Sequence, residues 1–304
     1  MKRYIGRHTV QALLTVILMY VIGTVLIAAS PIAADKAVRW SPLAAWGASW
    51  ETGQPVANRI VTAAGPSLLL FFLGTAVSFL LGVPLGVGSA ITDRENRWFQ
   101  AAFTVLSAIP ALVAGFVLIR LLAVEIPLFP LSGIESLSGA ISRSSGATRN
   151  GPAQIADVLY HSILPALVIA LADGNLMDVT HGAAAAVHTH RHMGYLEALD
   201  LIGMSRSRVI GRYFSRSALV SAVSAFRFRI PMLFGGLVVV EQVFSIPGLG
   251  NLFVRAMEYN DIPVLRALVV VLSLATGAAY LLSAFSVVLV DPTVRTEGVE
   301  CAAS

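Results

Sequence analysis

The sequence has little charge and almost no cysteine. Charged residues occupy 12% of its 304 positions and hydrophobic residues 56%, with a mean hydropathy of +0.78. A soluble domain carries roughly 25% charged residues. A chain this apolar cannot hide its surface from water, so a membrane must act as its solvent. The single cysteine, Cys301, excludes an intrachain disulfide framework and a cysteine metal cluster.

The sequence also lacks the short motifs of several enzyme classes. It contains no Gly-x-x-x-x-Gly-Lys-Ser/Thr phosphate loop, no Gly-x-Ser-x-Gly and no His-Glu-x-x-His. The glycine-rich stretch at 82–88 is not a phosphate loop, because no Gly-Lys-Ser/Thr follows it. This polypeptide therefore has no visible means of hydrolysing ATP. No basic patch is interleaved with aromatic residues, so the formal net charge of +4 does not indicate nucleic-acid binding.

What the sequence does contain is a series of long apolar segments. A hydrocarbon core about 30 Å thick needs roughly 20 helical residues to cross it. We predict an all-α, polytopic integral membrane protein with a single transmembrane domain over residues 1–304. Its six transmembrane helices are expected at 9–34, 67–90, 99–119, 162–187, 217–240 and 267–290. The first is longer than the apolar region of a signal peptide, about 7–15 residues, so we expect it to be retained.

Basic residues predict how the chain is oriented in the membrane. With the N-terminus inside, the inner connections hold a dense basic set: Lys2, Arg3, Arg7, Arg94, Arg97, Arg191, Arg206, Arg208, Arg212 and Arg216. The outer connections, including 35–59 and 123–158, spread their basic residues over longer stretches. Because cytoplasmic loops carry an excess of Lys and Arg, we expect both termini in the cytoplasm.

A basic, amphipathic loop at 190–216 joins the fourth and fifth predicted spans. Within it, apolar residues of Tyr195–Ile202 recur at helical spacing. Gly203 suits the position after a helix end, and Ser205 suits the N-cap of a second short helix. The pattern predicts a helix–glycine–helix loop on the cytoplasmic side. An ordinary basic cytoplasmic loop fits the spacing equally well.

Two parts of this region resemble a known family. Glu-Ala-Leu at 197–199, followed by Gly203, resembles the Glu-Ala-Ala-x-x-x-Gly loop of ABC-type import permeases. The segment 237–271, followed by DPTVR at 291–295, is similar to the dipeptide and oligopeptide branch of that family. The first pattern alone is a weak signal, and the second segment in the same order along the chain makes the resemblance specific.

The resemblance implies a coupling helix that docks on separate ATPase subunits. The residues implied at that contact are Glu197, Ala198, Leu199, Gly203, Ser205 and Arg208. The sequence departs from the family pattern at Leu199, which replaces the second alanine, and at Asp200 and Ile202, where basic residues are usual in this branch. The stretch 213–215 also departs from the hydrophobic-Leu-Pro ending of the wider family. The contact element must be short, helical and joined directly to the spans, so that closure of the partner subunits moves them.

The resemblance also implies the rest of the assembly. A second homologous permease, two ATPase subunits and an extracytoplasmic binding protein are expected in a bacterial inner membrane, surrounded by lipid. ATP and Mg²⁺ would belong to the ATPase subunits, and no cofactor is expected in this chain. The implied function is import of dipeptides or oligopeptides by alternating access. Nickel chelates, glutathione and haem are alternative cargoes within the family.

Two other classes of function stay open. A secondary transporter would also contain several spans, but it commonly shows inverted repeats and broken helices at matching positions, and the sequence shows no such repeat. A membrane scaffold or receptor subunit would not need the coupling loop. Dependence of transport on ATP and on an ATPase partner separates these classes.

Four charged residues interrupt the predicted fourth and fifth spans, namely Asp173, Asp178, Arg227 and Arg229. Because a charge inside the membrane is costly, such groups face a pore or a partner. One interpretation is pairing of aspartate with arginine inside the bundle. The other places Arg227 or Arg229 on the translocation pathway, where it would meet a peptide carboxylate. The family has small or amide residues at these two positions, so that role would be particular to this chain.

The segment 241–261 follows the fifth span. Its Ile-Pro-Gly-Leu-Gly stretch at 246–250 interrupts any regular helix. By resemblance, Glu241, Pro247 and Gly248 would lie at the outer gate, near the docked binding protein. A packed extracellular cap is the alternative interpretation of the same residues.

Three histidines precede the coupling loop. His188 and His192 would share one face of a helix, with His190 between them. No third ligand has suitable spacing, so a polar loop at the inner interface is expected rather than a metal site.

Overall fold

The computed structural model of the chain describes residues 2–28, 46–91, 105, 108–126, 128–129, 152–191, 214–226 and 230–290. Within these ranges every regular element is a helix, and one isolated antiparallel bridge pairs Ala48 with Pro55. The prediction of an all-α protein is confirmed.

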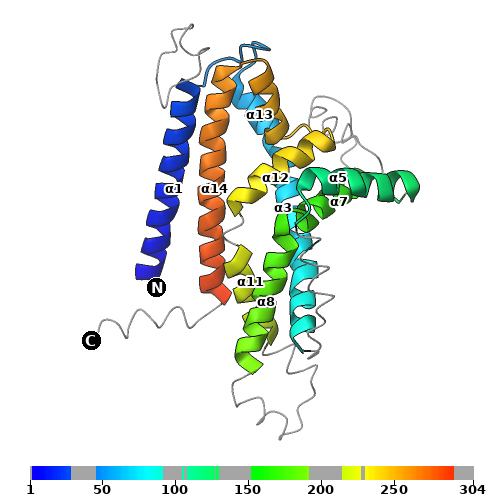
Figure 1. The fold of residues 1–304 in the computed structure, drawn as a ribbon. Coiled ribbons are helices and arrows are strands. Elements are labelled where there is room, and N and C mark those ends of the chain that lie inside the picture. The colour runs from blue at the N-terminus through cyan, green and yellow to red at the C-terminus, as the bar shows by residue number, and fades with distance from the viewer. Residues whose placement is uncertain are drawn as a thin grey trace, which may run out of the picture.

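Figure 1 shows how the helices are arranged. The elements are α1 (Lys2–Ala28), α3 (Val56–Ile91), α5 (Ala111–Ile119), η1 (Arg120–Glu125), α7 (Pro152–Leu171), η2 (Ala172–Gly174), α8 (Asn175–Arg191), α11 (Ser215–Phe226), α12 (Ile230–Val243), α13 (Leu249–Glu258) and α14 (Ile262–Val290). Of these, η1 has π-helical and η2 has 3₁₀ hydrogen bonding.

Three of the described helical segments are long and apolar enough to cross a membrane, namely Val56–Ala90, Val158–Thr189 and Ile262–Leu282. Two shorter apolar helices cover Thr9–Val25 and Met232–Val243. Helix α3 begins at Val56, ahead of the span predicted from residue 67. Only part of the predicted third span, 99–119, lies within the described residues.

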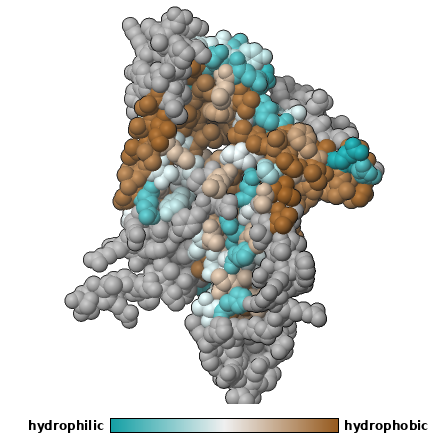
Figure 2. Space-filling view, in the orientation of Figure 1, coloured by the Kyte–Doolittle hydropathy of each residue, from teal (hydrophilic) through white to brown (hydrophobic). Residues whose placement is uncertain are grey.

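Large apolar side chains remain exposed on several of the apolar helices. On α1 they include Leu13, Leu14 and Leu18, and on α5 they include Leu112 and Phe116. Figure 2 shows such side chains gathered over α1, α14 and α5 on one face of the molecule. Water does not tolerate apolar patches of this extent, whereas lipid or a membrane-embedded partner does.

Two groups of helices make up the bundle. Helix α1 packs along α14, and α8 packs against both α3 and α11 (Figure 1). The main core extends from α3, α8 and α11 to α5, α7 and α12, and it includes fully buried Leu70, Leu164 and Val179. A smaller core joins α3, α13 and α14 around Val56, Val264 and further apolar residues.

Helices α8 and α11 approach each other closely. A Cβ atom added to Gly182 of α8 would lie 2.9 Å from the Ala222 Cα and 2.9 Å from the Ser221 carbonyl oxygen of α11. Only glycine fits such a backbone approach, and small residues at helix contacts are the usual device for it in membranes. These two helices flank residues 192–213, so the predicted coupling loop emerges from a tightly packed pair.

Candidate functional site

Helix α13 begins without a cap of its own. Its N-cap residue is Gly248, whose missing side chain cannot accept a hydrogen bond from the first-turn amides. An α-helix leaves its first N–H groups without intrahelical partners, and a buried end must satisfy them in another way. The two partners come from other helices, α3 and α12.

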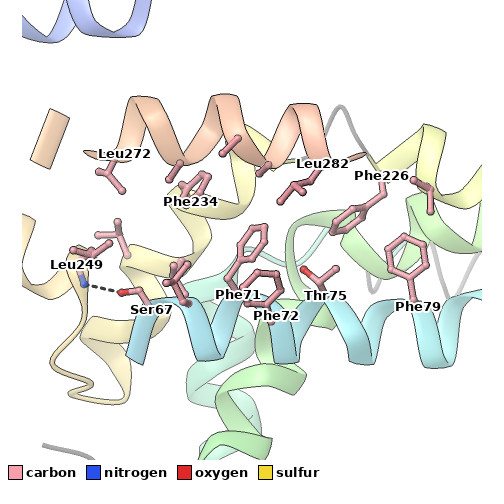
Figure 3. Close-up of a pocket in the computed structure, with 18 residues that line it drawn as sticks. Ser67, Phe71, Phe72, Thr75, Phe79, Phe226, Phe234, Leu249, Leu272 and Leu282 are labelled. Carbon is pink, nitrogen blue, oxygen red and sulfur yellow. Dashed lines mark hydrogen bonds between the residues drawn. The ribbon is translucent and has the colours of Figure 1, made fainter. Parts of the chain in front are cut away.

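Glu241 and Ser67 supply the missing acceptors. The Ser67 hydroxyl oxygen accepts a hydrogen bond from the Leu249 N–H at 2.7 Å, and it donates to Glu241 Oε1 at 2.6 Å. Glu241 Oε2 accepts a hydrogen bond from the Asn251 N–H at 2.9 Å. Figure 3 shows the bond between Ser67 and Leu249. The carboxylate thus binds α12 to the start of α13 and to α3, where the positive end of the helix dipole favours an anion.

Glu241 and Ser67 are buried, so their hydrogen bonds cannot be replaced by bonds to water. Glu241 has no exposed surface, and Ser67 is 2% exposed. Removing a carboxylate from water costs several kcal/mol. Hydrogen bonds to a charged group return about 1.5–3 kcal/mol each, so the residue is tolerated only where its donors are in place.

Gly248 is required by the same geometry. A Cβ atom at Gly248 would contact the Glu241 carboxyl group, and one at Gly250 would lie 2.6 Å from the Val238 Cα of α12. The Pro-Gly-Leu-Gly turn therefore lies directly against the carboxylate. Of the three predicted outer-gate residues, Glu241 and Gly248 meet at this site, and Pro247 beside them is exposed.

A second buried carboxylate lies at the other end of α13. Asp261, with no exposed surface, is bound by the Ser49 hydroxyl, by the Trp50 N–H at 3.1 Å and by Arg59 Nη1 at 3.3 Å. Its Oδ1 atom also lies 3.5 Å from the Val264 N–H, which makes Asp261 the N-cap of α14. One side chain thereby joins the 46–55 segment, α3 and α14.

Further ion pairs extend this Asp261 network. Arg59 Nη2 lies 2.9 Å from Glu51 Oε2, and Arg255 Nη2 of α13 lies 3.4 Å from Glu51 Oε1. The Arg59 and Glu51 side chains are only 12% and 13% exposed, whereas Arg255 is 55% exposed. The first pair is therefore shielded from solvent, and the second is screened and weaker.

Asp173 lies where the predicted fourth span breaks. Its φ of 54° and the φ of 78° at Gly174 are left-handed, so α7 ends and α8 begins across a kink. Asp173 Oδ1 accepts a hydrogen bond from the Ala111 N–H at 3.3 Å, at the start of α5. The Asn175 side-chain amide donates to the Ile169 carbonyl at 2.7 Å, which satisfies a carbonyl near the break. The charge in the apolar span therefore holds a helix junction.

Asp178 lies in the first turn of α8, and both aspartates line one open pocket. This pocket has a volume of about 490 Å³ and is also lined by Pro110, Met177 and Met232. Arg227 and Arg229 lie outside the described residues, so their pairing with the aspartates and their place on a pathway stay predictions.

A separate apolar pocket of about 370 Å³ lies between α3, α11, α12 and α14 (Figure 3). Aromatic rings line it, among them Phe71, Phe79, Phe226 and Phe234. The Thr75 hydroxyl is buried there and, within the described part of the chain, has no hydrogen-bond partner. Other hydroxyls in these helices donate to the carbonyl four residues earlier, as Ser78 of α3 does to Gly74 at 2.9 Å.

The predicted ATPase contact falls outside the described residues. Glu197, Ala198, Leu199, Gly203, Ser205 and Arg208 all lie within 192–213. His188 is an exposed residue near the end of α8, and His192 lies beyond the described part. These assignments stay predictions.

The model of one protein family matches residues 82–296, which include α8, α11, α12, α13, Glu241 and the predicted coupling loop. That family is described as the binding-protein-dependent transport system inner membrane component. The chain belongs to this family. The resemblance drawn from the residues is thereby confirmed, and the chain is a multi-pass membrane permease subunit of an ABC importer.

The relatives of this permease are named for different cargoes. It is 31% identical to the oligopeptide transport system permease protein AppB of Bacillus subtilis over 245 residues, which cover 80% of this chain and 73% of the relative. It is 31% identical to the metal-staphylopine import system permease protein CntB of Staphylococcus aureus, covering 75% and 66% of the two chains. It is 27% identical to the glutathione transport system permease protein GsiC of Salmonella choleraesuis, covering 75% and 68%.

Sequence reasoning missed Ser67 and the Asp261 network. Ser67 looks like any small residue of an apolar helix, and no local pattern marks it. Asp261 did have a signal, because an aspartate just before Ile-Pro at the start of a long apolar run is a typical N-cap. Its partners Ser49, Trp50 and Arg59 lie about 200 residues earlier, beyond the reach of any periodicity.

Proposed function

We propose that this permease is one membrane-spanning subunit of an ATP-driven importer of peptides and forms half of its translocation pathway. The observation that supports this most is the family match over residues 82–296, joined by relatives named as oligopeptide and peptide permeases. Because the sequence has no phosphate loop, ATP and Mg²⁺ belong to partner subunits.

The partners in this proposal are a second permease, two ATPase subunits and an extracytoplasmic binding protein. Residues 197–208 dock on one ATPase subunit, and Glu197, Ala198 and Gly203 enter its groove. Support comes from α8 and α11, which emerge on either side of the loop and pack backbone to backbone at Gly182. A lever must be stiff to transmit closure of the ATPase subunits to the spans, and a glycine-packed helix pair meets that requirement.

The proposed orientation places the coupling loop and both termini in the cytoplasm of a bacterial cell, and α13 at the outer side of the membrane. The basic residues of the inner connections support it. In this orientation the Glu241 site and the Asp261 network lie near the binding protein. The aspartate pocket at 173 and 178 lies at the kink of the fourth span, on the proposed pathway.

Peptides are the favoured cargo. Of the three relatives compared, the oligopeptide permease AppB gives the match that extends over the largest share of this chain and of the relative. Glutathione, itself a small peptide, is compatible with the same path. A metal chelate is the alternative cargo, as in the named function of CntB. The binding protein would select among these.

The test is transport by the purified complex. The permease is co-expressed with its genomic neighbours, purified, and placed in proteoliposomes with the binding protein and a tryptic peptide mixture. We expect ATPase subunits to co-purify, and peptides to accumulate only with ATP and without vanadate. Uptake that persists with vanadate, or a permease that never retains an ATPase, would contradict the proposal. Uptake of metal chelate alone would replace peptide as the cargo.

A further inference from the structure

The start of α13 is capped entirely by other helices. Its first-turn amides at Leu249 and Asn251 bind Ser67 of α3 and Glu241 of α12, at 2.7 Å and 2.9 Å. Ser67 and Glu241 also bind each other at 2.6 Å. Three helices therefore share one closed set of hydrogen bonds, buried from solvent.

A conventional cap is excluded at this position. Serine, threonine, aspartate or asparagine at the N-cap would normally bind the same amides from within the chain segment itself. Here the residue is Gly248, and any Cβ atom on it would contact the Glu241 carboxyl group. The arrangement replaces a local cap by a link between helices, and the two devices cannot occupy the space together.

We propose that Glu241, with Ser67, is a positioning residue that makes α3, α12 and α13 move as one rigid unit during transport. Helix α12 continues the predicted span that follows the coupling loop, so motion driven through that loop reaches α13 at the outer side. This inference rests on the proposed function, because it concerns the ATP-driven cycle. A helix end that is hydrogen-bonded to two neighbouring helices cannot move relative to them without breaking those bonds. Networks of hydrogen bonds between helices can therefore carry a motion from one helix to the next.

The decisive variant separates capping from linking. In Glu241→Ala combined with Gly248→Asp, the space left by the carboxylate admits an aspartate that caps α13 locally. Helix α13 then keeps a cap but loses its tie to α12. Glu241→Ala alone removes both the carboxylate cap of α13 and its tie to α12. Gln242→Ala, at the exposed neighbouring position on α12, is the matched control.

Motion is read by the distance between two spin labels in the complete transporter. One label replaces Gly235 of α12, where a Cβ atom meets nothing within 4 Å, and the other replaces Met257 of α13, which is 55% exposed. The native Cys301 is changed to serine so that only these sites are labelled. Distances are compared without nucleotide and after trapping with ATP and vanadate.

We expect one narrow distance, the same in both states, for the unsubstituted and Gln242→Ala transporters. In the double variant the complex should form at normal yield, but the distance should broaden or shift on trapping. The amount of peptide imported per ATP hydrolysed should fall about tenfold, within the range of typical coupling effects.

Three outcomes would overturn the inference: a distance that already changes in the unsubstituted transporter, a double variant whose distance stays fixed, or a double variant with unchanged coupling. Either of the last two outcomes would mean that Glu241 only caps α13 and does not link it to α12. Failure of the proposed function looks different, because a complex without ATP hydrolysis would not respond to vanadate at all.

Discussion

Replacing Asp261 by alanine should destabilise the permease strongly. The carboxylate accepts hydrogen bonds from Ser49, Trp50 and Arg59 and has no exposed surface. Its removal leaves the largely buried Arg59 charge without one of its two anionic partners. Breaking a buried ion pair by deleting one partner typically costs about 3–5 kcal/mol.

This loss converts to a change in melting temperature. With about 2.1 cal/mol/K of unfolding entropy per residue and 304 residues, the expected decrease is about 5–8 °C. Asp261→Asn should fall between, because the amide oxygen still accepts one N–H while the charge facing Arg59 is lost. The assay is loss of the monodisperse peak of the detergent-solubilised transporter after heating, followed by size-exclusion chromatography.

The control is Glu258→Ala, which removes the same charge from an exposed position at the end of α13. Its melting temperature should stay within about 1 °C of the unsubstituted transporter, as for most surface changes. If Asp261→Ala lowers the melting temperature no more than Glu258→Ala does, the network does not hold the 46–55 segment, α3 and α14 together.

Two further predictions use glycine and hydroxyl positions. Gly182→Ala should lower stability by about 1–3 kcal/mol, because its Cβ would lie 2.9 Å from the Ala222 Cα and from the Ser221 carbonyl oxygen of α11. Gly235→Ala meets nothing within 4 Å and should be neutral in the same heating assay, so equal effects would contradict the close packing of α8 on α11. Thr75→Val should leave stability unchanged or raise it, since the Thr75 hydroxyl is buried without a partner in the described part of the chain. Thr180→Val should lower stability by about 1 kcal/mol, because it removes the hydrogen bond from the Thr180 hydroxyl to the Leu176 carbonyl. A loss at Thr75 as large as that at Thr180 would show that its hydroxyl has a partner in the assembled transporter.

Composition and periodicity were enough to predict helices and their membrane setting. The long apolar runs account for α3 and α14, and the Pro-Gly-Leu-Gly stretch correctly placed a break between α12 and α13. Glu241 and Gly248 were predicted as outer-gate residues from the resemblance to the import permeases. The two residues do meet in the structure, and their proposed role at a gate stays a prediction.

What could not be predicted depends on contacts between distant residues. Ser67 and Glu241 lie 174 positions apart, and Asp261 and Arg59 lie 202 apart. No local pattern encodes which serine meets which carboxylate, since that follows from how α3 packs on α12 and α14. Asp173 was predicted as a charge in a span, but its left-handed backbone and its bond to the Ala111 amide emerge only from the packed kink.

The proposed function depends on force that ATPase subunits transmit to this permease through residues 197–208. The most direct measurement places a photo-crosslinking cysteine adduct at Leu199, in a transporter whose native Cys301 is changed to serine. We predict that light joins the permease to an ATPase subunit, in a pattern that changes with ATP and vanadate. Capture of only lipid or of the permease's own helices would contradict the account.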